Sequence, residues 1–230
     1  MINLINGDCL DTINQMLKDG VKVDCIVTDP PYKTTKRGSS GGTGGILKDK
    51  LNMQGKVFKH NDIKFNEWLP KCYEVLKESG HAYFMVNNKN LKNMQIEVEN
   101  AGFKIFKVIP WFKDNVITNM YYMDCVEFVI FCRKGKAKRI NNCGSKAAFF
   151  FKNPKNKEHP SEKPVELFEE MILNSSQENE LIFEPFGGVG GCAIACKKNN
   201  RNCIFCELDE VYFKKAQERL NKNEVQGELF

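Results

Sequence analysis

The chain has 230 residues, of which 42% are hydrophobic and 27% are charged, and its formal net charge is +5. This length and composition fit one globular α/β domain whose core needs no disulfide framework, although the chain contains ten cysteines. No run approaches the ~18 apolar residues of a membrane span, and the N-terminus lacks a basic region followed by an apolar stretch. We therefore expect neither membrane insertion nor secretion, but a cytoplasmic protein whose thiols are reduced and buried.

Short apolar strands alternate with amphipathic helices along the chain, which is typical of a mostly parallel sheet covered on both faces. The helix that starts near Trp68 is expected to end by Gly80. The predicted strands cover residues 1–4, 23–28, 82–86, 180–183 and 202–206. The predicted helices cover residues 10–17, 68–76, 91–100, 164–173, 192–198 and 212–220. Because residues 103–110 and 125–132 are expected to pair, the predicted fold is a doubly wound, mostly parallel sheet with an antiparallel edge pair.

Two segments carry most of the positive charge. Residues 33–64 hold eight Lys or Arg against two acids, and residues 133–157 hold nine Lys or Arg and no acid. With net charges of +6 and +9 there, the rest of the chain is at −10. This distribution favours a polyanion such as nucleic acid as a partner, with solubilising loops as the alternative. We predict one domain over residues 1–230, with a Gly-rich loop at 33–64, an irregular insertion at 133–157 and a tail at 222–230.

A glycine turn in the C-terminal half predicts a nucleotide-binding βαβ unit. A strand leads into Gly188-x-Gly190-x-x-Ala193, a helix follows, and the next strand ends in Glu207. Glycines allow a tight turn and a close backbone approach, and the helix N-terminus offers free N–H groups. Glu207 lies 19 residues after Gly188, where an acid can bind both hydroxyls of a ribose. The pattern fits NAD, FAD or S-adenosylmethionine, and a structural strand–helix turn is the alternative.

The tetrapeptide Asp29-Pro30-Pro31-Tyr32 follows a buried strand, at the end where open α/β sheets place their ligands. The lone pair of an adenine or cytosine amine is delocalised into the ring, so two acceptors directed at its hydrogens would free it for attack on a sulfonium methyl. The Asp29 carboxylate and the Pro30 carbonyl can supply these acceptors, with the proline pair stiffening their aim. Tyr32 offers a face for stacking an extruded base. A strand that simply ends in prolines is the alternative.

Taken together, these segments resemble the DNA amino-methyltransferases, with the catalytic tetrad before the cofactor motif. The resemblance covers most of the chain and implies a Rossmann-like, circularly permuted methyltransferase fold. It assigns catalysis to Asp29–Tyr32 and contact with the cofactor adenine to Asp8. Within the cofactor pocket it places His159, Lys163, Glu184, Pro185, Phe186, Gly188, Gly190 and Glu207. Glu184 stands where the family usually has Asp, and Val189 and Gly191 replace a usual Ser and Thr, which puts cofactor affinity in question.

The resemblance implies S-adenosylmethionine as cofactor, double-stranded DNA as partner and a restriction-modification setting. Because the family uses Asp in the tetrad for adenine and Ser for cytosine, adenine N6 is the expected target and cytosine N4 the alternative. Methylation at cytosine C5 is excluded, since it needs a Pro-Cys dipeptide that the chain lacks. A non-catalytic DNA-binding protein, a dehydrogenase and an RNA methyltransferase are the remaining alternatives.

Three weaker features complete the pattern. Four cysteines at positions 192, 196, 203 and 206 hint at zinc, but Cys203 and Cys206 on one strand should face opposite sides, so no metal site is predicted. Residues 149–151, three phenylalanines, are expected to be part of a strand, with a DNA-inserting wedge as the alternative. The tail Gln226–Phe230 resembles the peptide by which bacterial replication proteins bind the sliding clamp, with a frayed terminus as the alternative.

Overall fold

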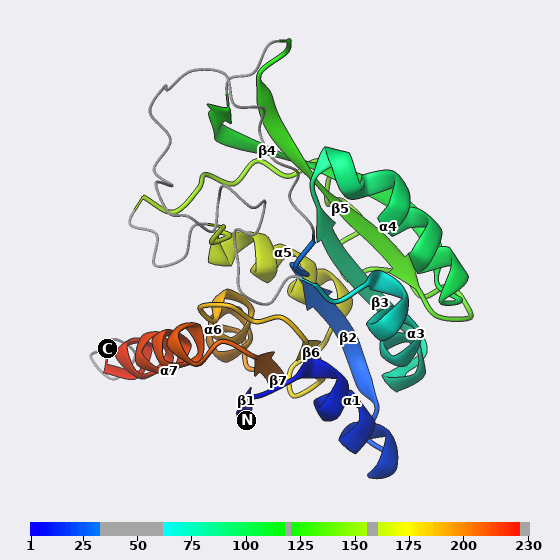
Figure 1. Ribbon diagram of the computed structural model, residues 1–230, viewed down its shortest axis with the longest axis vertical. Coiled ribbons are helices and arrows are strands. Elements are labelled where there is room, and N and C mark those ends of the chain that lie inside the picture. The colour runs from blue at the N-terminus through cyan, green and yellow to red at the C-terminus, as the bar shows by residue number, and fades with distance from the viewer. Residues whose placement is uncertain (33–61, 118–120, 156–160, 226–230) are drawn as a thin grey trace.

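The computed structural model describes residues 1–32, 62–117, 121–155 and 161–225 (Figure 1). Most of the loop at 33–64, His159 and the tail Gln226–Phe230 therefore lie outside the described residues. The elements, in chain order, are β1 (Ile2–Asn6), α1 (Cys9–Lys18), β2 (Val23–Thr28), α3 (Phe65–Val75), β3 (Leu76–Val86), α4 (Asn88–Asn100), β4 (Lys104–Ile117), β5 (Asp124–Arg133), α5 (Val165–Ser175), β6 (Leu181–Glu184), α6 (Gly191–Lys198), β7 (Asn202–Glu207) and α7 (Glu210–Val225).

The described strands form a seven-stranded sheet in the order β1-β7-β6-β2-β3-β5-β4. The first five strands in this order, from β1 at the edge to β3, are each parallel to their neighbours. Strand β5 runs antiparallel to both β3 and β4. The predicted mostly parallel sheet with an antiparallel edge pair is thus confirmed. The circular permutation implied by the resemblance stays a prediction.

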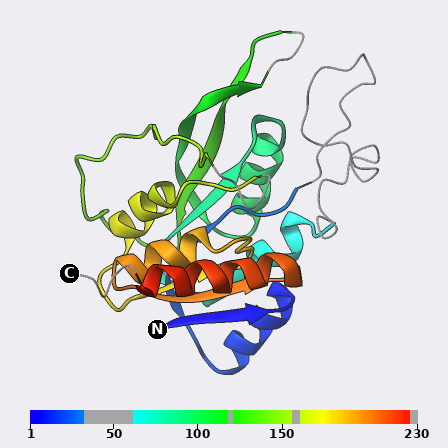
Figure 2. The same cartoon turned by 90° about the vertical axis from the view of Figure 1, so that its left-hand side faces the viewer.

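Helices cover both faces of the sheet and create two cores (Figures 1 and 2). One core lies between the sheet and α5, α6 and α7, and the other lies between the sheet and α1, α3 and α4. Alternate side chains of a strand enter opposite cores: in β7, Cys203 and Phe205 contribute to the first, and Ile204 packs against the second. None of the described helices is long and apolar enough to span a membrane.

The helix–strand boundary after α3 differs from the prediction. The helix ends at Val75, one residue before its predicted end, but β3 begins at once with Leu76 instead of at the expected residue 82. Gly80 therefore lies inside β3, and the prediction that it separates the helix from the strand is wrong. The Lys134 amine donates to the Tyr73 carbonyl at 2.6 Å and to the Leu76 carbonyl at 2.9 Å, which satisfies the carbonyls at the end of the helix. A register shift between β2 and β3 accommodates the early residues of β3. The contact of Lys134 with the helix end is a tertiary contact, which the hydrophobic periodicity of residues 65–86 does not reveal.

The basic segment 133–157 begins as the last residue of β5 and continues without a helix or strand as far as it is described, to residue 155. Phe149 forms an isolated parallel bridge with Trp111, in which its N–H donates to the Pro110 carbonyl at 2.8 Å. The strand expected over residues 149–151 is thus reduced to one bridge. The rings of Phe112 and Phe150 stack 5.0 Å apart at its side.

Candidate functional site

The tetrad and the glycine turn lie at the same edge of the sheet. Strands β2 and β6 are parallel neighbours, with Cys25 opposite Ile182 and Ile26 opposite Phe183. Asp29 directly follows β2, and Glu184 ends β6, so both residues lie at the edge of the sheet where these two parallel strands end. Two segments more than 150 residues apart in the sequence are thereby brought together, as the chemical argument from the sequence requires.

The glycine turn between β6 and α6 is held tightly against β7. The Gly187 N–H donates to the Cys206 carbonyl at 2.8 Å, and a Cβ at Gly187 would lie 1.9 Å from the Phe205 ring. Gly190 precedes α6 with a φ of 86°, a left-handed conformation that favours glycine. A Cβ at Gly188 would meet no atom of the described residues within 4 Å. The turn therefore leaves open space beside Gly188, where a ligand can approach the backbone.

Glu207 and Asp8 flank this turn from the adjacent strand ends. The Glu207 carboxylate accepts the Gly188 N–H at 2.7 Å and the Asp209 N–H at 2.8 Å. Burial raises the pKa of Glu207, and these two N–H groups oppose the rise. Asn6 pairs with Glu207 in register, so Asp8, which caps α1 by accepting the Leu10 N–H at 2.7 Å, lies at the same edge.

Glu184 is buried at the end of β6, where its carboxyl accepts the Phe186 N–H at 3.1 Å. Burial raises the pKa of Glu184 well above its usual range. Pro185 is buried beside it, and the Phe186 ring packs edge-on against Trp68 with centroids 5.1 Å apart. These contacts fix the start of the turn against α3.

Asp29 is the end of a chain of four alternating charges, here called the ion chain. Its Oδ2 lies 2.9 Å from the Lys163 Nζ, which also lies 3.0 Å from Oε2 of Glu127. The second Glu127 oxygen lies 2.9 Å from the Lys113 Nζ. The other Asp29 oxygen, Oδ1, is buried and has no hydrogen-bond partner among the described residues. A buried, unused acceptor costs free energy unless a ligand fills it, so Oδ1 is the position for a donor.

The charges of the ion chain are mutually dependent. Burial favours the neutral form of Glu127, but the Lys163 and Lys113 ammonium groups outweigh it and lower its pKa to about 2. Burial likewise disfavours charge on Lys163, yet the carboxylates of Asp29 and Glu127 raise its pKa above its usual range. For Asp29, burial is the largest influence and raises the pKa, while Lys163 opposes it.

The remaining tetrad residues are at least partly buried. Pro30 is buried, and Pro31 and Tyr32 are partly buried. The Tyr32 ring packs against the core that contains Trp68. Burial raises the pKa of the Tyr32 hydroxyl, and a backbone hydrogen bond with Asn87 opposes the rise. Tyr32 therefore stays neutral and held at its hydroxyl end.

Sequence reasoning missed part of this site. Glu127 and Lys113 were not predicted as site residues, although Glu127 is a lone acid within the apolar strand 125–132. A charged residue in such a strand needs a buried partner, and that signal could have found it. Lys163 was predicted to meet the cofactor, whereas its amine lies on Asp29. His159 is outside the described residues.

We expect a Glu127→Gln variant to be less stable than the parent chain by about 3 kcal/mol at neutral pH, since the folded-state pKa of Glu127 is about 2 against an ordinary 4.5. A depressed carboxyl pKa stabilises the fold above the ordinary pKa, and this stabilisation is lost as the pH falls toward 2. Urea unfolding from neutral pH to about pH 3 should show the difference between the two proteins shrinking with acid.

Glu169→Gln is the matched control, because the Glu169 carboxylate pairs with Lys198, whose side chain is 53% exposed. Its cost should stay below about 1 kcal/mol. A Glu127→Gln cost no larger than this, or one that is constant with pH, would contradict the coupling of the ion chain.

Comparisons with known proteins agree with this geometry. A family model described as DNA methylase matches residues 23–218. Type II methyltransferase M2.LlaDCHI of Lactococcus lactis subsp. cremoris is 26% identical over 246 residues, covering 97% of this chain and 91% of the relative. Type II methyltransferase M.HpaI of Haemophilus parainfluenzae is 28% identical over 226 residues, covering 86% of this chain and 68% of the relative.

Solved structures share the fold. The crystal structure of the M1.HpyAVI-SAM complex superposes with a TM-score of 0.74 at 24% identity, covering 95% of this chain and all of the other. The cytosine-N4-specific PvuII DNA methyltransferase superposes with a TM-score of 0.72 at 14% identity, covering 95% of this chain and 86% of the other.

Proposed function

This chain belongs to the DNA methylase family, and we propose on that premise that it transfers a methyl group from S-adenosylmethionine to the N6 amine of adenine in double-stranded DNA. The observation that carries the proposal is the unused, buried Oδ1 of Asp29, which lies at the same sheet edge as the glycine turn. An acceptor with no partner beside a nucleotide-binding turn fits an amine donor brought next to a bound cofactor.

The residues at this edge fit S-adenosylmethionine. Glu207 would bind the ribose hydroxyls and Asp8 the adenine end, while the open space beside Gly188 admits the cofactor close to the backbone. The same pocket would include Glu184, Pro185, Phe186 and Gly190. When bound, the cofactor supplies an activated sulfonium methyl group, so no metal or covalent nucleophile is needed for the transfer.

The tetrad holds the target amine. Asp29 Oδ1 and the Pro30 carbonyl accept its two hydrogens, which favours a tetrahedral nitrogen with a free lone pair. Lys163 forms an ion pair with Oδ2, the other carboxylate oxygen of Asp29, so the orientation of Oδ1 does not depend on the substrate. Asp29 Oδ1 is also placed to accept the proton that the amine loses on methylation. Tyr32 presents its ring to the extruded base.

An acid at position 29, as in the adenine-specific members that the tetrad resembles, supports adenine N6 over cytosine N4.

Contact of the insertion at 133–157 with DNA phosphates is supported by its exposed cations, which are Lys136, Lys138, Arg139, Lys146, Lys152 and Lys155. One domain over 1–230 with a loop at 33–64 and a tail at 222–230 remains the proposed organisation.

Incubation of the protein with tritiated S-adenosylmethionine and unmethylated DNA, followed by analysis of the nucleosides, tests the proposal. We expect label in N6-methyladenine. Label in N4-methylcytosine would replace the proposed target, and no label with DNA would favour a non-catalytic binding protein. The same assay with RNA tests the remaining substrate class. Loss of sliding-clamp binding on deletion of residues 226–230 would separately support that predicted partner.

We expect Glu207→Gln to weaken S-adenosylmethionine binding about ten- to hundredfold, because it removes a charged acceptor from the ribose position. Isothermal titration calorimetry measures the affinity, and thermal unfolding checks that the turn stays folded. Glu210→Gln is the matched control, since Glu210 begins α7 with an exposed side chain. Equal affinities of the two variants would remove Glu207 from the proposed pocket.

A further inference from the structure

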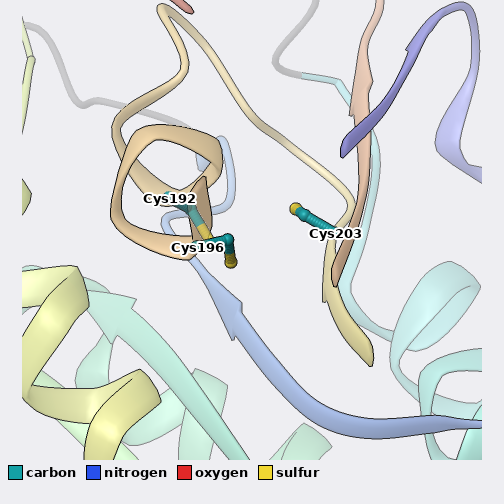
Figure 3. A group of neighbouring side chains, drawn as sticks. All are labelled: Cys192, Cys196 and Cys203. Carbon is teal, nitrogen blue, oxygen red and sulfur yellow. The ribbon is translucent and has the colours of Figure 1, made fainter. Parts of the chain in front are cut away.

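Three cysteines lie close together between α6 and β7 (Figure 3). Cys192 and Cys196 lie one helical turn apart on α6, and Cys203 lies on β7. Their sulfur atoms all lie within 4.8 Å of one another, and the Cys203 side chain points toward the pair on the helix (Figure 3). This group, here called the thiol triad, is buried, with residue exposures of 1%, 0% and 1%.

The surroundings of the thiol triad are apolar. All three cysteines belong to the core that also contains Ala193 and Phe205. Cys206, three residues after Cys203, faces the other way and donates to the Gly7 carbonyl at 3.0 Å, as expected for a strand. No fourth His, Cys, Asp or Glu joins the group within the part of the chain that the structure describes.

Charge decides which ion such a site can take. Three thiolates carry a charge of −3, and a net charge in an apolar interior costs several kcal/mol or more. A divalent zinc ion would leave one negative charge uncompensated, and structural zinc also takes a fourth ligand that the triad lacks. A monovalent copper ion would leave two negative charges. Only a trivalent ion makes a neutral complex with three thiolates.

We propose that the thiol triad is a binding site for a trivalent thiophilic ion, of which arsenic(III) is the probe. Neutral arsenous acid condenses with the three thiols: three As–S bonds form and three As–O bonds break. Each thiol proton leaves with a hydroxide as water, so three waters are released and arsenic stays trivalent. No oxidant or reductant takes part. Cys203 and Cys206 face opposite sides of β7 and cannot share an ion, whereas Cys203 faces the two cysteines of α6.

Intact-protein mass spectrometry of the full chain tests the site. The protein is kept reduced with a phosphine, because a dithiol reductant would itself bind arsenite, and is incubated with sodium arsenite. We expect a mass increase of one arsenic atom less three hydrogens. Cys196→Ser and Cys203→Ser should each abolish this species. Cys206→Ser, on the opposite face of the same strand, and Cys143→Ser, at an exposed cysteine, should keep it.

Two results would overturn the proposal: no arsenic adduct on the parent chain, or an adduct that survives Cys196→Ser and Cys203→Ser. A parallel incubation with zinc chloride, followed by removal of unbound metal, should leave no zinc on the chain. Zinc retained by the parent and lost in the Cys203→Ser variant would contradict the charge argument. Because the readout is binding alone, its outcome is independent of methyl transfer.

Discussion

Replacing Asp29 with alanine is expected to lower the rate of methyl transfer to DNA about 10²- to 10³-fold, because a fixed acceptor aimed at the reacting amine is lost. Cofactor binding should be retained, since the proposed cofactor contacts come from Asp8, Glu207 and the glycine turn. The fold should tolerate the change, because Lys163 keeps its second partner Glu127 and burial already raises the pKa of Asp29. Tritiated-methyl incorporation measures the rate, and calorimetry measures cofactor affinity.

Asp11→Ala is the matched control, because Asp11 is an exposed acid in the first turn of α1. It should leave both quantities unchanged. If Asp29→Ala kept the parental rate, Asp29 would not hold the amine. If it lost cofactor affinity and rate in equal measure, the carboxylate would serve the cofactor instead.

Replacing Lys163 with methionine is expected to lower the free energy of unfolding by about 3–5 kcal/mol, because it leaves two carboxylates without their shared cation. The Lys163 side chain is only 6% exposed, and those of Asp29 and Glu127 are 21% and 19% exposed, so water replaces the lost partner poorly. Methionine keeps the length and apolar volume of the lysine stem, so the effect reports charge. Urea unfolding at neutral pH measures it.

Lys198→Met removes the cation of an exposed ion pair with Glu169 and should cost about 0–1 kcal/mol. A Lys163→Met cost in that same range would show that the ion chain is not a coupled unit. A double variant, Lys163→Met with Asp29→Asn, should recover part of the lost stability, because it removes the carboxylate that Lys163→Met leaves without a cation, whereas Glu127 keeps its ion pair with Lys113.

Periodicity predicted most of the fold because the strands are buried on alternating or both faces. The strand 23–28 was predicted with the bounds of β2, and the antiparallel pair of 103–110 with 125–132 is present as β4 and β5. The junction at Val75 and Leu76 was not predictable in this way. It depends on Lys134, whose amine donates to the carbonyls of Tyr73 and Leu76. These residues lie about sixty positions apart in the sequence, so a local pattern does not predict the contact.

The residues of the candidate site were likewise predictable only in part from the sequence. The tetrad and the glycine turn follow strands directly, so their meeting at one sheet edge could be inferred from the order of βα units. The ion chain could not, because Lys113, Glu127 and Lys163 come from separate segments whose pairing depends on three-dimensional packing. The thiol triad likewise depends on the packing of α6 on β7, which brings Cys203 against the helix.

A crystal structure of the protein with a non-reactive cofactor analogue and DNA containing unmethylated adenine is the most direct test of the shared-edge geometry. We expect the amine of an extruded adenine within hydrogen-bond distance of Asp29 Oδ1 and the Pro30 carbonyl. The cofactor should lie over residues 184–191, with its reactive centre facing that amine. A cofactor bound at another edge of the sheet, or an amine bound away from Asp29, would contradict it.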